Sequence, residues 1–272
     1  MSAILTPTIY VVAIGLILAA ILTFASKIFF VPVDETVSNL NEALPGANCG
    51  ACGYAGCSDY AEAIVNGDPV NKCPVGGAEV ASALAEIMGV DAGDSEKIVA
   101  VVQCNGNCDA TERTMDYQGM ATCQAANQLY GGAGACSYGC LGIGDCVVAC
   151  DFNAIHICNG VAVVDREKCV GCGACAKACP KSIIRMAPEK NKVIVQCHSN
   201  AKPKDTMKAC KNGCIGCSKC VKVCKFDSIT VKDGLAYIDP ETCKNCGLCQ
   251  KECPTGAIIN MRVKKPAVKK AE

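Results

Sequence analysis

The sequence predicts an α+β chain in which an N-terminal transmembrane helix is followed by several small cysteine-rich modules. Three observations support this fold class: residues 9–30 are almost entirely apolar, cysteine accounts for 26 of the 272 residues, and the cysteines recur at short, regular spacings. Tryptophan is absent and aromatic residues make up only 4% of the chain, so little conventional core can form. Because small modules need metals or disulfides as staples, and Cys-x2-Cys repeats favour thiolates on metal, we expect metal-binding modules in a reducing cytoplasm.

The apolar N-terminus predicts a membrane anchor in residues 1–30. Residues 1–26 contain no charged side chain, and about 20 apolar residues span a bilayer as a helix. A cleaved signal peptide would instead begin with basic residues and carry a shorter apolar segment. We therefore expect a single-pass anchor in the cell (inner) membrane that contacts lipid through residues 5–30. Lys27 follows the apolar run, and the positive-inside rule then places the Cys-rich part on the cytoplasmic side.

Residues 31–90 predict a small module with one metal site. Its four cysteines follow one another at x2, x4 and x15 spacings: Cys49, Cys52, Cys57 and Cys73. Glycines between them permit the left-handed turns that a loop needs to wrap a cluster. We assign one [4Fe–4S] cluster to this module, with zinc as the alternative. Short helices are expected over residues 60–65, capped by Ser58-Asp59, and over residues 78–90, ended by Gly89.

Two later stretches share one signature, in which three cysteines at x2 intervals are followed by a fourth cysteine just before a proline. The first runs from Cys169 to Pro180 and the second from Cys243 to Pro254. In two-cluster ferredoxins, the first three cysteines bind one [4Fe–4S] cluster and the fourth binds its neighbour. Zinc sites also use Cys-x2-Cys pairs, but three evenly spaced cysteines fit them poorly.

Residues 136–196 and 197–262 are thus predicted to form two tandem bacterial-type 2[4Fe–4S] ferredoxin-like modules. Each contains a hairpin, at Asn159-Gly160 and at Asp233-Gly234. Residues 91–135 form a Cys-containing connector that includes a predicted strand at residues 98–102. Residues 263–272 form a basic tail.

The crossed-ligand rule assigns four cysteines to each of four clusters in these modules. Ile143 stands where the second module has Cys217, and we expect Cys136 to substitute as a ligand. The expected sets are Cys136, Cys140, Cys146 and Cys179; Cys150, Cys169, Cys172 and Cys175; Cys214, Cys217, Cys220 and Cys253; and Cys224, Cys243, Cys246 and Cys249.

With the module of residues 31–90, five clusters take up 20 of the 26 cysteines. Three of the others, Cys104, Cys108 and Cys123, are available to join one more cysteine in a sixth cluster, and the alternative is that they are reduced, buried thiols. The remaining cysteines without an assignment are Cys158, Cys197 and Cys210.

Charge is unevenly distributed along the chain. Residues 1–164 contain 4 Lys/Arg and 16 Asp/Glu, whereas residues 165–272 contain 22 Lys/Arg and 10 Asp/Glu. We do not expect a nucleic-acid partner, because clusters with four thiolates are anionic and nearby lysines offset that charge. The same lysines can steer an acidic protein partner.

The sequence contains no dinucleotide-binding G-x-G-x-x-G, no P-loop and no visible nucleophile–base pair. His156 and His198 are expected to be surface or hairpin residues and not ligands. The chain is therefore predicted to conduct single electrons, with no catalytic nucleotide site of its own.

Two stretches, Ala47–Cys57 and Gly139–Cys146, together with the anchor and the tandem cysteine modules, closely resemble the B subunit of the Rnf complex. The resemblance implies an ion-translocating ferredoxin:NAD oxidoreductase, a membrane complex that couples electron flow to Na⁺ or H⁺ translocation. It further implies that the chain accepts electrons from reduced ferredoxin and passes them to other Rnf subunits, which hold the flavins and the NADH site. The alternatives are a polyferredoxin adaptor of another membrane redox enzyme, such as a hydrogenase, and a zinc-stapled scaffold.

Overall fold

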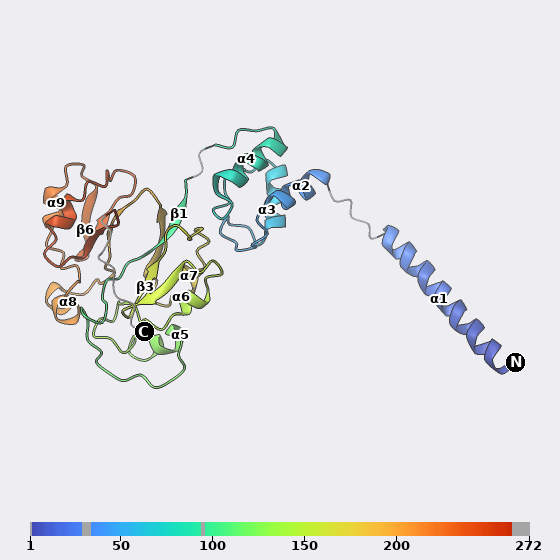
Figure 1. The fold of residues 1–272 in the computed structure, drawn as a ribbon, viewed down its shortest axis with the longest axis horizontal. Coiled ribbons are helices and arrows are strands. Elements are labelled where there is room, and N and C mark those ends of the chain that lie inside the picture. Colours follow the sequence, from blue (N-terminus) through green and yellow to red (C-terminus); the bar gives the residue numbers. More distant parts are fainter. Residues whose placement is uncertain (1, 29–33, 94–95, 263–272) are drawn as a thin grey trace.

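The computed structural model describes residues 2–28, 34–93 and 96–262. The first helix, α1 (Ser2–Ile28), lies apart from the rest of the chain (Figure 1). Its large apolar side chains that the structure describes, such as Tyr10, Leu16 and Phe24, are each more than half exposed. A search of the described residues finds no helix that is both long and apolar enough to cross a membrane. The transmembrane anchor therefore stays a prediction, and the predicted basic tail lies outside the described residues.

Three helices, α2 (Glu35–Ala43), α3 (Cys57–Val65) and α4 (Gly77–Met88), pack into one small unit. Its core consists of nearly fully buried side chains: Leu40, Tyr60, Ile64 and Leu84. The left-handed Gly89, at φ 65°, ends α4 as predicted. The predicted helix at 60–65 is longer than expected and begins at Cys57.

The start of α3 is capped differently from the prediction. The side-chain oxygen of Asn48 accepts a hydrogen bond from the Cys57 amide at 2.8 Å, and no side chain of Ser58 or Asp59 caps the helix. The cap comes from a residue in the cysteine loop itself, so the same contact holds the loop against the helix.

The described strands form four two-stranded antiparallel sheets. Two of them are hairpins, β2 (Ile155–Cys158) with β3 (Val161–Val164), and β6 (Ile229–Lys232) with β7 (Leu235–Ile238). Their turn residues have positive φ, at 49° and 78° for Asn159-Gly160 and at 49° and 76° for Asp233-Gly234. Consecutive positive φ values are the type I′ geometry that Asn-Gly and Asp-Gly favour, and both predicted hairpins are confirmed.

The other two sheets pair strands that are distant in sequence. Strand β1 (Ile98–Val102) pairs with β4 (Ile184–Pro188), and β5 (Val193–Val195) pairs with β8 (Ile258–Asn260). The predicted strand at residues 98–102 is therefore part of the first ferredoxin-like module and not of a separate connector. Strand β5, expected within the first module, completes the sheet of the second module instead.

Short helices follow the cysteine loops of both modules: α6 (Asp145–Val148), α7 (Ala174–Ala178), α9 (Lys219–Val223) and α10 (Leu248–Lys251). Each begins after a left-handed residue, which is glycine in three cases and Ser218 in the fourth. Two more helices lie in stretches expected to be connector and linker, α5 (Cys123–Gln128) and α8 (Pro203–Ala209). The cores of the modules include many of the cysteines themselves, which pack beside the aliphatic side chains of the hairpins.

Candidate metal centres

The four cysteines of the N-terminal module surround one site, which we name the Cys49 set (Cys49, Cys52, Cys57 and Cys73). Burial raises the pKa of Cys52, and the nearby charges of Cys49 and Cys57 raise it further. The pKa of Cys73 is raised in the same way, by burial and then by Cys52 and Cys57. The Gly76 amide donates a hydrogen bond to the Cys73 sulfur at 3.4 Å. The predicted grouping is therefore present in the fold.

In the first module, Cys150, Cys169, Cys172 and Cys175 line one pocket and form the Cys150 set. The Ala100 amide donates to the Cys169 sulfur at 3.3 Å, and the Ala154 amide to the Cys150 sulfur at 3.4 Å. Burial, followed by the charges of the other three cysteines, raises the pKa of Cys175 to about 11. This arrangement agrees with the predicted set.

A second pocket of the first module differs from the prediction in one cysteine. It is lined by Cys123, Cys140, Cys146 and Cys179, which we name the Cys140 set. Burial raises the pKa of Cys146 to about 12, with further contributions from Cys140, Cys123 and Cys179. The structure thus brings Cys123 to this pocket, whereas the expected fourth member, Cys136, lines another one.

The position of Cys123 results from tertiary contacts at the start of α5. The Asp145 carboxylate accepts hydrogen bonds from the Cys123 amide at 2.8 Å and the Gln124 amide at 3.1 Å. Thr122 caps the same helix by accepting from the Ala125 amide. Because Asp145 directly precedes Cys146, these bonds hold Cys123 beside the cysteine loop of the first module.

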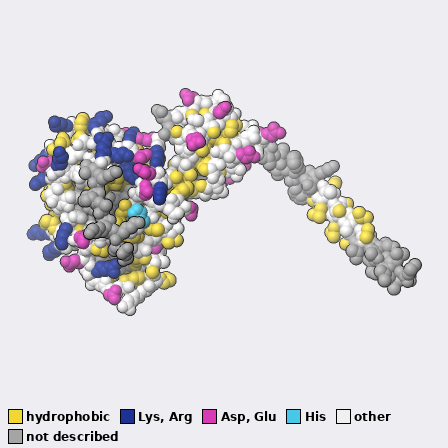
Figure 2. Space-filling view, in the orientation of Figure 1, with side chains coloured by type: hydrophobic (Ala, Val, Ile, Leu, Met, Phe, Trp, Pro, Cys, Tyr) yellow, Lys and Arg dark blue, Asp and Glu magenta, His cyan; other side chains and the backbone are white. Residues whose placement is uncertain are grey.

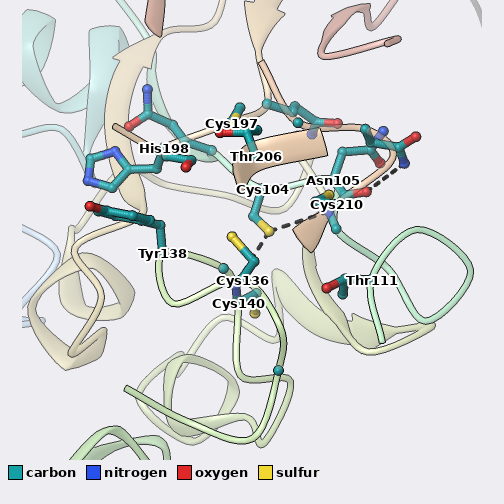
Figure 3. Close-up of a pocket in the computed structure, with 18 residues that line it drawn as sticks. Cys104, Asn105, Thr111, Cys136, Tyr138, Cys140, Cys197, His198, Thr206 and Cys210 are labelled. Atoms are coloured by element: carbon teal, nitrogen blue, oxygen red, sulfur yellow. Dashed lines mark hydrogen bonds between the residues drawn. The ribbon is translucent and has the colours of Figure 1, made fainter. Parts of the chain in front are cut away.

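Cys136 lines a pocket together with Cys104, Cys197 and Cys210 (Figure 3), and these four residues form the Cys104 set. Burial raises the pKa of Cys104 to about 12, and the charges of Cys140 and Cys136 contribute. Burial also raises the pKa of Cys210, followed by the charges of Cys136 and Cys197. Sequence reasoning placed only Cys104 near a sixth site, together with Cys108 and Cys123, which lie elsewhere.

In the second module, the structure brings together Cys214, Cys217, Cys220 and Cys253, and likewise Cys243, Cys246 and Cys249, whereas the place of Cys224 in its predicted group stays a prediction. The Cys214 set comprises Cys214, Cys217, Cys220 and Cys253, and the Cys224 set comprises Cys224, Cys243, Cys246 and Cys249. Burial raises the pKa of Cys214, and the charges of Cys197 and Cys253 add to this. The pKa of Cys249 is raised to about 11 by burial and then by Cys243, Cys246 and Cys220.

Cys253 behaves differently from the other buried thiols. Burial raises its pKa, but backbone amides of Ile258, Thr255 and Ala257 and the Thr255 hydroxyl outweigh burial, so that the pKa is lowered. Several N–H donors directed at one sulfur are the environment that stabilises a thiolate on a cluster. This is the cysteine before proline that the crossed-ligand rule assigns to the neighbouring site.

The remaining cysteines and the histidines take no part in these sets. Cys108 is exposed, and its amide donates to the Asn159 carbonyl at 3.1 Å. Cys158 lies at the end of β2. His156 is exposed, as expected for a hairpin residue, whereas His198 lines the pocket of the Cys104 set.

The donor type and the surroundings of these sets suit iron–sulfur clusters. Within residues 2–28, 34–93 and 96–262, no three His, Cys, Asp or Glu side chains are close enough to hold a single metal ion. A [4Fe–4S] cluster takes one thiolate at each of four separate irons, so its ligands need not meet around one ion. Burial raises the pKa of Cys104, Cys146, Cys175 and Cys249, so cluster binding must displace the protons of these thiols.

Comparison with protein families identifies three matching segments. Residues 44–75 match a "Putative Fe-S cluster" model, residues 162–185 match a "4Fe-4S binding domain", and residues 213–257 match a "4Fe-4S dicluster domain". The three segments contain the Cys49 set, the first signature and most of the second module. Iron–sulfur binding by this chain is therefore supported independently of its geometry.

Near-full-length relatives are similar to this chain, and three of them are B subunits of ion-translocating complexes. The chain is 46% identical over 260 residues to the B subunit of the Na(+)-translocating ferredoxin:NAD(+) oxidoreductase complex of Acetobacterium woodii, covering 95% of this chain and 78% of the relative. It is 42% identical to the B subunit of the ion-translocating oxidoreductase complex of Methanosarcina acetivorans, covering 95% and 99%. It is 41% identical to the B subunit of the proton-translocating ferredoxin:NAD(+) oxidoreductase complex of Clostridium ljungdahlii, covering 95% and 93%.

Proposed function

Because this chain belongs to the B-subunit family of ion-translocating oxidoreductase (Rnf) complexes, we propose that it relays electrons from reduced ferredoxin toward the membrane subunits. The complex couples electron transfer from ferredoxin to NAD⁺ with the translocation of Na⁺ or H⁺. The chain contributes as the iron–sulfur subunit of that oxidoreductase. When bound, [4Fe–4S] clusters accept and release single electrons, and the residues of this chain hold, space and insulate them.

One observation carries the proposal, namely that neighbouring cysteine sets adjoin one another, from the Cys49 set through the first module and again within the second. The charge of Cys49 contributes to the raised pKa of Cys172, after burial, so the Cys49 set lies near the Cys150 set. Likewise, the charge of Cys175, in the Cys150 set, contributes to the raised pKa of Cys146, in the Cys140 set. In the second module, Cys220 acts on Cys249 and links the Cys214 and Cys224 sets. Adjacent sets are what stepwise transfer of single electrons requires.

The second module supports docking of an acidic ferredoxin. Cys217 and Cys246 are exposed at its surface, and three exposed lysines follow Cys217 closely in sequence, Lys219, Lys222 and Lys225. No lysine of residues 202–251 forms an ion pair with another described residue. Figure 2 shows Lys and Arg gathered over the body that holds the two modules, while acidic side chains mark the N-terminal unit. Opposite charge on a partner would favour approach at the second module.

At the other end of the chain, we place residues 5–30 in the lipid bilayer as a single-pass anchor with the modules on the cytoplasmic side. The exposed apolar side chains of α1 support this placement, because they contact no part of the described chain that would bury them. The Cys49 set follows the anchor in sequence and is suited to hand electrons to the other Rnf subunits.

The proposal is tested with Cys49→Ala in the assembled complex. Ferredoxin-driven reduction of the other clusters should persist, whereas NAD-linked activity should be lost, because the last set before the membrane lacks a ligand. Cys158→Ala is the matched control, since Cys158 belongs to no set. Unchanged NAD-linked activity in the Cys49 variant would reject the assignment. Co-purification with a hydrogenase instead of Rnf subunits would favour the adaptor alternative.

A further inference from the structure

The Cys104 set is built from equivalent residues of the two modules. Cys104 follows β1 in the first module, and Cys197 follows β5 in the second, each in a Val-Gln-Cys sequence. Cys136 precedes Cys140 with three residues between them, as Cys210 precedes Cys214. Each module thus contributes the same two positions to one shared pocket (Figure 3).

The sulfurs from the two modules face a common space. A side chain at Gly106 would meet the Cys210 sulfur at 3.3 Å and the Cys104 sulfur at 3.6 Å. A side chain at Gly139 would meet the Cys136 sulfur at 3.7 Å. Glycine at these positions leaves open the space that the thiols border.

The surroundings of this pocket match those of the other sets. The amides of Cys140 and Gly106 donate to the Cys104 sulfur at 3.3 and 3.4 Å, as amides do to Cys150 and Cys169. Cys104 and Cys210 are each only 8% exposed. Four cysteines from two modules, two of them buried and two partly buried, form a complete ligand set for one cluster.

Two buried amide oxygens indicate an anionic occupant. Gln103 and Gln196 both line the pocket, and their side-chain oxygens are buried without a hydrogen-bond partner among the described residues. The oxygen and nitrogen of an amide are interchangeable by rotation. With the amides turned, each glutamine would offer N–H groups, which an anionic cluster would accept.

We propose that Cys104, Cys136, Cys197 and Cys210 bind a sixth [4Fe–4S] cluster that joins the two ferredoxin-like modules. Its neighbours are Cys140 on one side, which donates to the Cys104 sulfur, and Cys214 on the other, whose sulfur lies near Cys197. One-electron oxidation at one set is balanced by one-electron reduction at the next, with no bond or proton exchanged. Cluster binding stands on the pocket alone, and only the role in the row rests on the proposed function.

The decisive variant is Cys136→Ala combined with Cys210→Ala, which leaves two thiolates in the pocket. The full chain is purified without oxygen, and iron, sulfide and zinc are measured per chain. At about four irons per cluster, the natural chain should contain about 24 irons, and the double variant about 20. Cys108→Ala combined with Cys158→Ala is the matched control and should retain about 24, because neither residue belongs to a set.

Several outcomes would overturn the proposal: about 20 irons in the natural chain, an unchanged count in the double variant, or one zinc that the double variant loses. Should the first variant fail to fold, Cys104→Ala with Cys197→Ala removes the other pair, and the count in the natural chain remains decisive by itself. A natural chain with about 20 irons and intact ferredoxin-linked reduction would refute the sixth cluster and keep the relay. Unchanged NAD-linked activity in Cys49→Ala would refute the proposed relay but leave the iron count, and with it the sixth cluster, unaffected.

Discussion

The exchange of Cys136 for Cys123 in the first module leads to a sharp prediction. Cys123→Ala removes one of the four thiols that line the pocket of the Cys140 set. With three thiolates the fourth iron of the cube has no cysteine ligand and is easily lost, so the variant should lose about one iron if a smaller cluster survives and about four if the site empties, out of about 24. Burial raises the pKa of Cys146 to about 12, so an emptied site would hold neutral thiols near pH 7. We therefore expect the variant to fold.

The first module itself offers a way to restore the missing ligand. Ile143 occupies the position that corresponds to Cys217, three residues beyond Cys140, which gives the same x2 spacing. Adding Ile143→Cys to Cys123→Ala should therefore return the full iron content and the spectrum of the reduced cluster. The same addition to Cys136→Ala should restore nothing, because Cys136 lines a different pocket.

The assay is iron and sulfide content of the anaerobically purified chain, with low-temperature EPR after reduction and Cys158→Ala as control. The reasoning fails if Cys123→Ala keeps both its full iron content and the EPR spectrum of the unsubstituted chain. It also fails if Ile143→Cys rescues Cys136→Ala, since Cys136 would then belong to the Cys140 set.

Three further predictions follow from the fold and the charges. Gly216 has φ 61°, and a Cβ there would lie 2.7 Å from the Gly234 carbonyl oxygen. Gly216→Ala should therefore lower the free energy of unfolding by about 1–2 kcal/mol for the left-handed backbone and by about 1–3 kcal/mol more for the clash. Gly256 has φ 67° and open space around it, so Gly256→Ala should show only the backbone cost in anaerobic urea unfolding. Equal losses of stability in the two variants would contradict the clash with the Gly234 carbonyl. Lys219→Glu with Lys222→Glu should slow association with an acidic ferredoxin by about tenfold at low salt and weaken the salt dependence of the rate. Lys204→Glu with Lys208→Glu on α8 is the control and should slow association less. Equal stopped-flow rates for the two double variants would refute docking at the second module. Burial raises the pKa of Cys104 and Cys146 from 9.0 to about 12, so the folded state favours the neutral thiols. The contribution of these thiols to the unfolding free energy of the cluster-free chain should therefore be complete below pH 9 and be lost as the pH rises toward 12. Denaturant midpoints that stay constant across that range would contradict the burial of these thiols.

Local signals in the sequence predicted the local structure well. The positive φ values at Asn159-Gly160 and Asp233-Gly234 follow from residues that tolerate the left-handed region. The x2 spacings likewise predicted which cysteines gather in the second module. The helix at residues 35–43 was not predicted, because it contains few apolar residues and buries only Leu40.

The fourth ligand of the Cys140 set could not be predicted from spacing, because Cys123 reaches it through a tertiary contact with Asp145. One signal was nevertheless present. Cys136 corresponds to Cys210 in the alignment of the two modules, and Cys210 belongs to neither predicted set of the second module. Equivalent positions in repeated modules take equivalent places, so the alignment already argued against Cys136 as a substitute. Strand pairing between β5 and β8 was missed for a similar reason, since it joins segments that are distant in sequence.

The two departures from the predicted ligand sets have one physical origin. The first module has an isoleucine where the second has Cys217, so its own loop provides one thiolate too few. If Cys136 filled that vacancy, the shared pocket would keep only three cysteines, and the row of sets would be interrupted between Cys140 and Cys214. Because α5 brings Cys123 from the connector instead, Cys136 stays paired with its counterpart Cys210 across the module boundary. The segment between β1 and the first cysteine loop therefore completes one site and, by doing so, leaves the ligands of a second site free.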